Sequence, residues 1–261
     1  MIIDCHNHPD WHGHNLDKFL ANMQANDIDI TWLLSWECPD DEYDIGGYGK
    51  AMSPGCGPDG PVPLSRCLSY IERAPGKFVL GYAPDPRKPG AIDRLQGAID
   101  IYGARVYGEL KLRMMYDNPD ALRMYRFCGE KGLPVLVHID YELGGSSKYP
   151  RPNYWYGGGI EAFERAIAAC PGTVFLGHAP GFWAHISGDG QFDKVAYPKG
   201  PVAPGGKLID MLRQYPNLYC DLSAGSGCNA LSRDPEFAKE FLLEFRDRVL
   251  YGRDYFDNQH Q

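Results

Sequence analysis

Residues 133–138, LPVLVH, and residues 173–178, TVFLGH, are short apolar runs that each end in histidine. Runs of this kind, with few charges, are typical of strands buried on both faces of a parallel sheet. Similar runs predict further strands at residues 2–6, 28–35, 78–83, 104–112, 217–222 and 248–252. Amphipathic stretches fill the gaps between them. The chain therefore alternates strand and helix, which predicts parallel strands joined by right-handed crossovers.

Eight such units within 261 residues predict an α/β fold, and specifically a (β/α)8 TIM barrel. The alternative is an open doubly wound sheet, but neither GxGxxG nor GxxxxGK[ST] follows any strand. Helices are expected over residues 16–26, 90–102, 159–169 and 205–215, and helix-start signals occur at residues 118–120 and 234–236. The sequence stops seven residues after Asp254, so the eighth helix is expected to be short or missing. Either a partner chain or another segment would then cover strand eight, or the chain has been shortened.

The composition excludes several classes of function. Lys and Arg number 26 against 34 Asp and Glu, a net charge of −8, which argues against binding nucleic acid or an anionic membrane. No apolar run reaches about 18 residues, and the N-terminus MIIDCHNHP resembles neither a signal peptide nor a transit peptide. The eight cysteines are scattered without a CxxC pair, as expected of reduced, buried thiols. We therefore expect a cytoplasmic protein with a single barrel domain over residues 1–261.

Histidines and an aspartate gather at the ends of the predicted strands. His6 and His8 lie two residues apart at the end of strand one, so they share one face. His138 and His178 close strands five and six, and Asp254 follows strand eight. In a barrel, the carboxyl ends of all strands meet at one rim, where active sites are built. One histidine at a strand end is more often structural, but this group predicts a metal site, for which imidazole and carboxylate are suitable ligands.

These residues lie in motifs of a known family: IIDCHNH at 2–8, GELKL at 108–112, LPVLVH at 133–138, FLGHAPG at 175–181 and LYGRDYF at 250–256. In these motifs, and from residue 1 to about 256, the sequence resembles the amidohydrolase superfamily, within it the amidohydrolase-related branch of metal-dependent TIM-barrel hydrolases and decarboxylases. The resemblance implies that His6, His8 and His138 are metal ligands. It implies that His178 is either a ligand of a second metal or a catalytic residue that polarises the substrate. It also implies that Asp254 contacts the metal and takes a proton from bound water.

Strand four leaves the metal count open. Glu109, Lys111 and Arg113 alternate along it and face the same way. The resemblance allows Glu109 to bridge two metals, a carboxylated Lys111 to do so, or neither to bind in a one-metal site. We favour Glu109, because a carboxylate needs no modification to bind a metal. Otherwise Glu109 and Lys111 form an ion pair that lines the barrel, or Lys111 as a free ammonium balances the metal ligands or binds an anionic group of the substrate.

Three long inserts follow predicted strands, at residues 37–63, 140–158 and 179–204, and are rich in Gly, Pro, Tyr and Trp. In a barrel they form a rim around one pocket. Their aromatic and basic side chains either contact substrate or pin the loops to the barrel. The residues expected to bind substrate are Lys111, Arg113, Arg151, Trp155 and Trp183.

Together these features predict a metal-dependent hydrolase that uses a metal-activated water on a small carbonyl substrate, namely a lactone, ester or amide. The expected catalytic residues are Asp254 and His178, and the candidate metal ligands are His6, His8, Glu109, His138, His178 and Asp254. Zinc is the favoured ion, with Mn, Fe or Ni as alternatives and one or two ions per chain. A metal-dependent non-oxidative decarboxylase is the second hypothesis, and a non-catalytic metal- or ligand-binding barrel is the third. The unfinished eighth helix favours a homo-oligomer.

Overall fold

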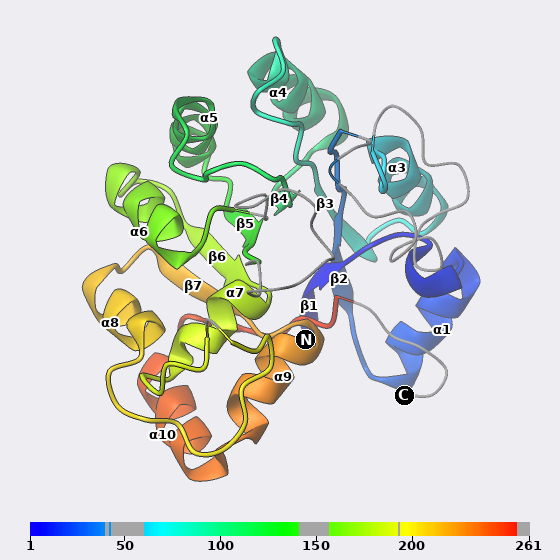
Figure 1. Ribbon diagram of the computed structural model, residues 1–261. Helices are drawn as coiled ribbons and strands as arrows, with labels where there is room; N and C mark the ends of the chain where they lie inside the picture. Colours follow the sequence, from blue (N-terminus) through cyan, green and yellow to red (C-terminus); the bar gives the residue numbers. More distant parts are fainter. Residues whose placement is uncertain (40–41, 43–59, 141–156, 193, 255–261) are drawn as a thin grey trace. The chain divides into compact units, whose positions relative to one another are not determined.

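The computed structural model describes residues 1–39, 42, 60–140, 157–192 and 194–254 (Figure 1). The chain divides into two compact units, and each is considered by itself. Unit 1 comprises Met1–Leu110 and Tyr251–Gln261, and unit 2 comprises Lys111–Leu250. Both units consist of parallel strands that alternate with helices, so the predicted α/β class is confirmed. The single domain over residues 1–261 stays a prediction.

Unit 1 holds the first four strands. Its elements are β1 (Ile3–Asn7), α1 (Leu16–Ala25), β2 (Ile30–Leu34), α3 (Leu64–Arg73), β3 (Phe78–Gly81), α4 (Ala91–Tyr102) and β4 (Tyr107–Leu110). Strands β1, β2 and β3 pair in that order, all parallel. The segment before β4 joins β3 through a hydrogen bond from Tyr82 N to Val106 O of 2.9 Å. On the other side, Cys5 N donates to Tyr251 O at 2.9 Å, which brings the segment after β8 next to β1.

Unit 2 holds the remaining strands. Its elements are α5 (Pro119–Glu130), β5 (Val135–His138), α6 (Ile160–Ala169), β6 (Phe175–His178), α7 (Pro180–Trp183), α8 (Lys207–Gln214), β7 (Leu218–Asp221), α9 (Ala224–Ser232), α10 (Pro235–Phe245) and β8 (Val249–Leu250). Strands β5, β6, β7 and β8 pair in sequence order, all parallel. Their side chains are mostly buried on both faces, as the uninterrupted apolar runs predicted.

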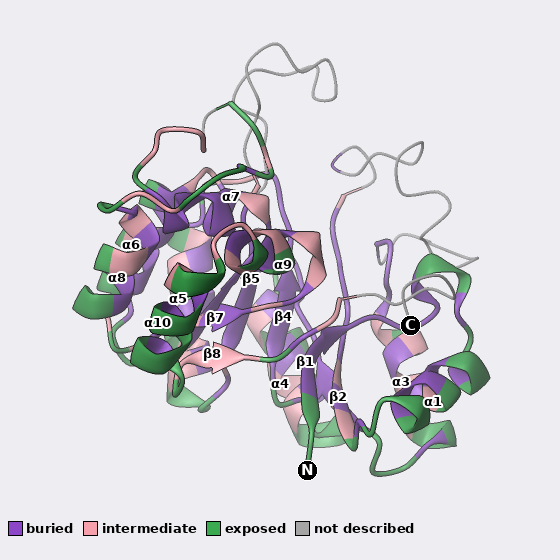
Figure 2. Cartoon of the chain, turned by 90° about the horizontal axis from the view of Figure 1, so that it is seen from below, coloured by how far each residue is buried: buried purple, intermediate pink, exposed green. Residues whose placement is uncertain are grey.

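The longer helices bury one face and expose the other, as Figure 2 shows by their green residues, whereas α7 and most strands are purple. In α5 the buried positions are Ala121, Met124, Tyr125 and Cys128, which recur at helical spacing. The start signal at 118–120 acts as predicted, since the Asn118 side chain accepts a hydrogen bond from Asp120 N at 2.8 Å.

Three of the described α-helices were not predicted: the short α7, which lies in the insert at 179–204, and helices α3 and α9. Helix α3 follows directly on the Gly- and Pro-rich insert at 37–63, whose composition masked the helical spacing of its buried Cys67 and Tyr70. Helix α9 has the sequence AGSGCNALS, and Gly and Ser are poor helix formers. Its stability comes from packing against α7 and α10, a tertiary effect that local sequence does not report.

The described ends of the first insert are fixed to the strands of unit 1. Trp36 and Val62 exchange two backbone hydrogen bonds, of 2.9 and 3.2 Å. The buried Glu37 carboxylate accepts from both terminal nitrogens of Arg94, at 2.9 and 2.6 Å, and from Tyr82 Oη at 3.3 Å. Residues 43–59 of this insert, most of the second insert and the position of the eighth helix lie outside the described residues.

Within the described part of the chain, no helix is long and apolar enough to span a bilayer. The described cysteines are all free thiols; Cys228 is exposed and the other six are buried.

Candidate metal centre

In unit 1, His6 and His8 meet at the end of β1. Both side chains are almost fully buried, at 0% and 1% exposure. Their Nε2 atoms lie 3.3 Å apart. The alternation of side chains along a strand predicted this shared face.

Two carboxylates of the same unit join the pair. Glu109 Oε2 lies 3.3 Å from His8 Nε2 and 3.9 Å from His6 Nε2. Asp254 Oδ1 lies 3.6 Å from each of the two Nε2 atoms. We call His6, His8, Glu109 and Asp254 the unit 1 donor set.

The spacing of this donor set is close to that of the ligands around a zinc ion. With bonds of about 2.1 Å, a tetrahedral ion holds its ligand atoms about 3.4 Å apart. Five of the six distances between these atoms run from 3.3 to 3.9 Å, and the ligand atoms of His6, His8 and Asp254 all lie within 4.8 Å of one another. Two imidazoles and two carboxylates are a combination that zinc accepts. His6, His8 and Asp254, with Glu109 beside them, are therefore suited in spacing and in chemistry to a divalent cation.

Backbone contacts hold the donors in these positions. His8 Nδ1 lies 2.8 Å from the carbonyl oxygen of Leu34, which can only accept, so Nδ1 carries the proton and Nε2 presents its lone pair. Glu109 N donates to Ser35 O at 2.8 Å, and Asp254 N donates to His6 O at 2.7 Å. Neighbouring strands thus place the donors, and the tautomer of His8 is the one that a metal ligand requires.

The Trp11 ring packs against the His8 ring. Its ring centroid lies 5.1 Å from that of His8 and 6.4 Å from that of Trp36. The loop that carries it is anchored through Asp10, which accepts hydrogen bonds from Tyr70 Oη at 2.9 Å and Arg66 Nε at 2.7 Å. These contacts restrict the motion of the His8 ring on its apolar side.

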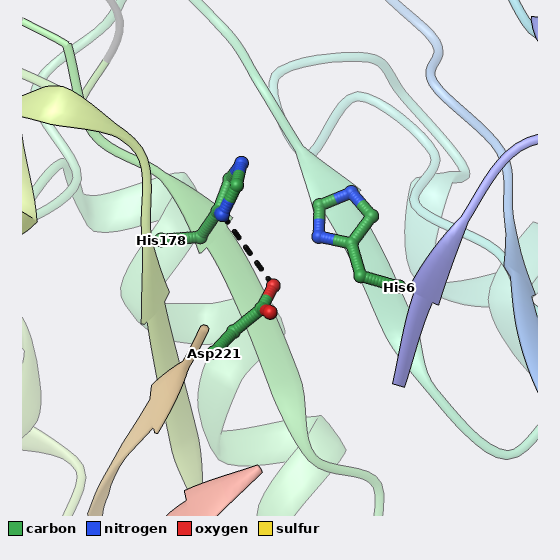
Figure 3. Close-up of side chains that lie close together, drawn as sticks. All are labelled: His6, His178 and Asp221. Carbon is green, nitrogen blue, oxygen red and sulfur yellow. Dashed lines mark ion pairs between the residues drawn. The ribbon is translucent and has the colours of Figure 1, made fainter. Parts of the chain in front are cut away.

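In unit 2, His138 and His178 lie side by side. They are register partners on β5 and β6, and their ring centroids are 5.3 Å apart. Nδ1 of His178 lies 2.9 Å from Ser223 Oγ and 3.5 Å from Asp221 Oδ2, an ion pair drawn in Figure 3. Because these two groups occupy the Nδ1 side, Nε2 is the atom with which His178 can meet a metal or a substrate.

Sequence reasoning missed Asp221 and Ser223. Asp221 is fully buried at the end of β7, and its Oδ1 accepts from Ser223 N at 2.9 Å. The signal was present in LYCD, residues 218–221, because this strand also ends in a residue that can bind a metal or a proton. The rule applied to strands one, five, six and eight applies equally to strand seven.

The remaining predicted site residues are distributed as follows. Lys111 and Arg113 are buried in unit 2, at 5% and 9% exposure. Trp183 is 1% exposed and its indole N–H donates to the backbone oxygen of Asp221 at 2.9 Å, the loop-pinning role that the sequence also allowed. Arg151 and Trp155 lie outside the described residues.

His185, in the short 3-10 helix η2 (Ala184–Ile186) that follows α7, stacks on Phe192 with a centroid distance of 4.4 Å. Burial lowers the pKa of its imidazole from 6.5 to about 4; the charge of Lys207 adds to this effect and that of Glu161 opposes it.

The sequence was compared with models of protein families. A family model described as Amidohydrolase matches residues 3–261. The chain belongs to the amidohydrolase family. A search of curated proteins by sequence finds no significant match.

Several solved structures are similar to this chain in fold. A TIM-barrel protein from Bordetella bronchiseptica has 18% identity and a TM-score of 0.58, over 97% of this chain and 85% of that one. An amidohydrolase from Burkholderia multivorans with bound zinc has 12% identity and a TM-score of 0.60, over 98% and 84% of the two chains. A 5-carboxyvanillate decarboxylase from Sphingomonas paucimobilis has 12% identity and a TM-score of 0.51, over 97% and 88%. These likenesses confirm the predicted TIM-barrel fold.

Proposed function

We propose that this amidohydrolase is a metal-dependent hydrolase that cleaves a C–O or C–N bond in a small carbonyl compound, namely a lactone, an ester or an amide. The observation that carries the proposal is the unit 1 donor set. Its two imidazoles and two carboxylates are buried or half-buried, and their ligand atoms converge at distances suited to a divalent cation. Water, which such an ion can activate, is the co-substrate of hydrolysis.

Zinc is the favoured ion, and manganese, iron or nickel are alternatives. His6, His8, Glu109 and Asp254 would hold it, and the similar amidohydrolase from Burkholderia multivorans contains bound zinc. A divalent ion in such a site supplies Lewis acidity and lowers the pKa of a coordinated water to about 7. We also propose His138 as a further metal ligand. His178 would be either a ligand of a second ion or a residue that polarises the substrate.

The chain's own residues would then manage the proton and the substrate. Asp254 can offer one carboxylate oxygen to the ion and accept a proton on the other. His178, held at Nδ1 by Ser223 and Asp221, would donate from Nε2 to the oxygen on which negative charge develops. Lys111 and Arg113 supply positive charge for an anionic group of the substrate. Arg151, Trp155 and Trp183 remain proposed substrate contacts.

The test is a product analysis with zinc-loaded protein in water enriched in oxygen-18. Lactones, esters and amides are assayed beside carboxylated aromatic rings and enols. The proposal expects one labelled oxygen in the product acid of a compound from the first group. Asp254→Asn should lower this rate at least about 100-fold, the usual contribution of a general base. Asp247→Asn, at a carboxylate that is 91% exposed, is the matched control and should leave the rate unchanged.

Release of carbon dioxide without incorporation of label would replace hydrolysis by decarboxylation, the reaction after which the similar Sphingomonas protein is named. Turnover by Asp254→Asn at the rate of the unchanged protein would contradict the role given to Asp254.

A further inference from the structure

The carboxylate of Asp4 lies at the centre of the hydrogen bonds behind the unit 1 donor set. Its side chain is fully buried on β1, two residues before His6. Oδ1 accepts from His6 N at 3.2 Å and from Arg253 N at 3.0 Å. Oδ2 accepts from Asn7 Nδ2 at 3.3 Å and from Arg253 Nε at 2.9 Å. The Asp4 carboxylate therefore binds the backbone N–H of His6, a candidate metal ligand on β1. It also binds Arg253, the residue before the candidate ligand Asp254.

The Arg253 side chain ties this junction to a third element. Its guanidinium is 12% exposed, pairs with Asp4 and also donates from Nη1 to Asn22 Oδ1 on α1. Asn22 itself is 4% exposed. Arginine presents its nitrogens in a rigid planar fork, so it fixes direction as well as charge. Lysine at this position could keep the charge but not the pair of contacts.

Asp254, the residue that follows Arg253, has a left-handed backbone conformation. Its φ is +64°, in a region that residues other than glycine adopt uncommonly. Such a conformation persists only where the surroundings impose it. Here they are the bonds from Arg253 N to Asp4 and from Asp254 N to His6 O. Both bonds end on β1, so they set the distance between Asp254 and the histidine pair.

We propose that Asp4 and Arg253 form a positioning pair that sets the spacing of the unit 1 donor set, although neither contacts the ion. The inference rests on the proposed function only in that the donor set binds a divalent cation. Groups that orient metal ligands in this way typically contribute a factor of about 10 to 100 in metal affinity. We expect a loss of that size when Arg253 is replaced by methionine, because Asp4 then loses the guanidinium that holds its carboxylate in place, and its hydrogen bond to the backbone before Asp254 is weakened.

The experiment measures zinc affinity by competition with a chelator and records the visible absorption spectrum of the cobalt(II)-loaded protein. Arg253→Met should raise the Kd for zinc about 10- to 100-fold and change the intensity and position of the cobalt bands. Arg253→Lys and Asp4→Asn should show intermediate losses. Arg246→Met, at a guanidinium that is 74% exposed, is the matched control and should keep the Kd and the spectrum unchanged. Circular dichroism establishes which variants are folded.

A merely structural role would lower the melting temperature of the variants but leave the zinc Kd and the cobalt spectrum of the folded protein unchanged, and that result would overturn the proposal. If Arg253→Met does not fold, the milder Arg253→Lys and Asp4→Asn decide in the same way. If the unchanged protein binds neither zinc nor cobalt, the donor set itself fails, and the proposed function and this inference fall together. If the unchanged protein binds metal and the variants bind it equally well, the positioning pair is refuted and the proposed function is not affected.

Discussion

The buried imidazole of His185 makes a quantitative prediction about acid stability. Burial holds its pKa at about 4 in the folded protein, against 6.5 for the ordinary side chain. Between these values the unfolded chain binds a proton that the folded chain does not. Stability is therefore fully present above pH 6.5 and is lost as the pH falls towards 4.

The magnitude follows from the two pKa values. Linkage gives a loss of about 2 kcal/mol in the free energy of unfolding between pH 7.5 and pH 5.0 from this one group. His185→Phe removes the titration and retains a ring that can stack on Phe192. The variant should therefore lose about 2 kcal/mol less than the unchanged protein over this interval.

The assay is urea unfolding at both pH values, followed by circular dichroism, for the two proteins in parallel. The two proteins differ only at position 185, so the difference between their losses of stability isolates His185. Equal losses of stability in the two proteins would refute the assignment of a buried, neutral imidazole. A greater loss in the variant would mean that the protonated form of His185 stabilises the fold.

Three further predictions concern the supports of the site and the association of the chain. Arg94→Met should lower the free energy of unfolding by about 2 kcal/mol in urea, because the buried Glu37 keeps only weaker partners; an unchanged value would contradict the buried ion pair. Gly177→Ala should cost about 1–3 kcal/mol in the same assay, since its new methyl group would lie 2.3 Å from the Phe182 ring, whereas Gly172→Ala meets nothing within 4 Å and serves as control. Light scattering should find a dimer or larger assembly, and Leu243→Glu, at a side chain that is 64% exposed on α10, should weaken it if that face joins the copies; a monomeric unchanged protein would refute the oligomer.

The fold could be predicted because its signals are local. Short apolar runs mark the strands, and caps such as Asn118 mark helix starts, so most elements were placed within a few residues. Strand ends were less exact: the run at 104–112 contains a strand only over Tyr107–Leu110, because the ladder ends where a neighbouring strand no longer pairs. Helix α9 could not be predicted, since its Gly- and Ser-rich sequence gains its stability from tertiary packing.

Some contacts of the candidate site could likewise be predicted from the sequence, and others could not. The pairing of His6 with His8 follows from alternation within one strand, and the meeting of Glu109 and Asp254 with them follows from the gathering of strand ends at one rim. The link between Asp4 and Arg253 spans 249 positions and depends on side-chain geometry, so no local pattern reports it. Asp221 differs from both cases, because its place at a strand end was visible in the sequence.

Metal content tests the central claim most directly. Protein purified without chelator is analysed for zinc, manganese, iron and nickel, beside a His6→Ala, His8→Ala double variant and an exposed control, Lys239→Ala. The donor set predicts about one ion per chain in the unchanged protein and the control, and none in the folded double variant. Two ions would point to a second site with His178. A folded, unchanged protein that contains no metal and takes up neither added zinc nor added manganese would contradict the account.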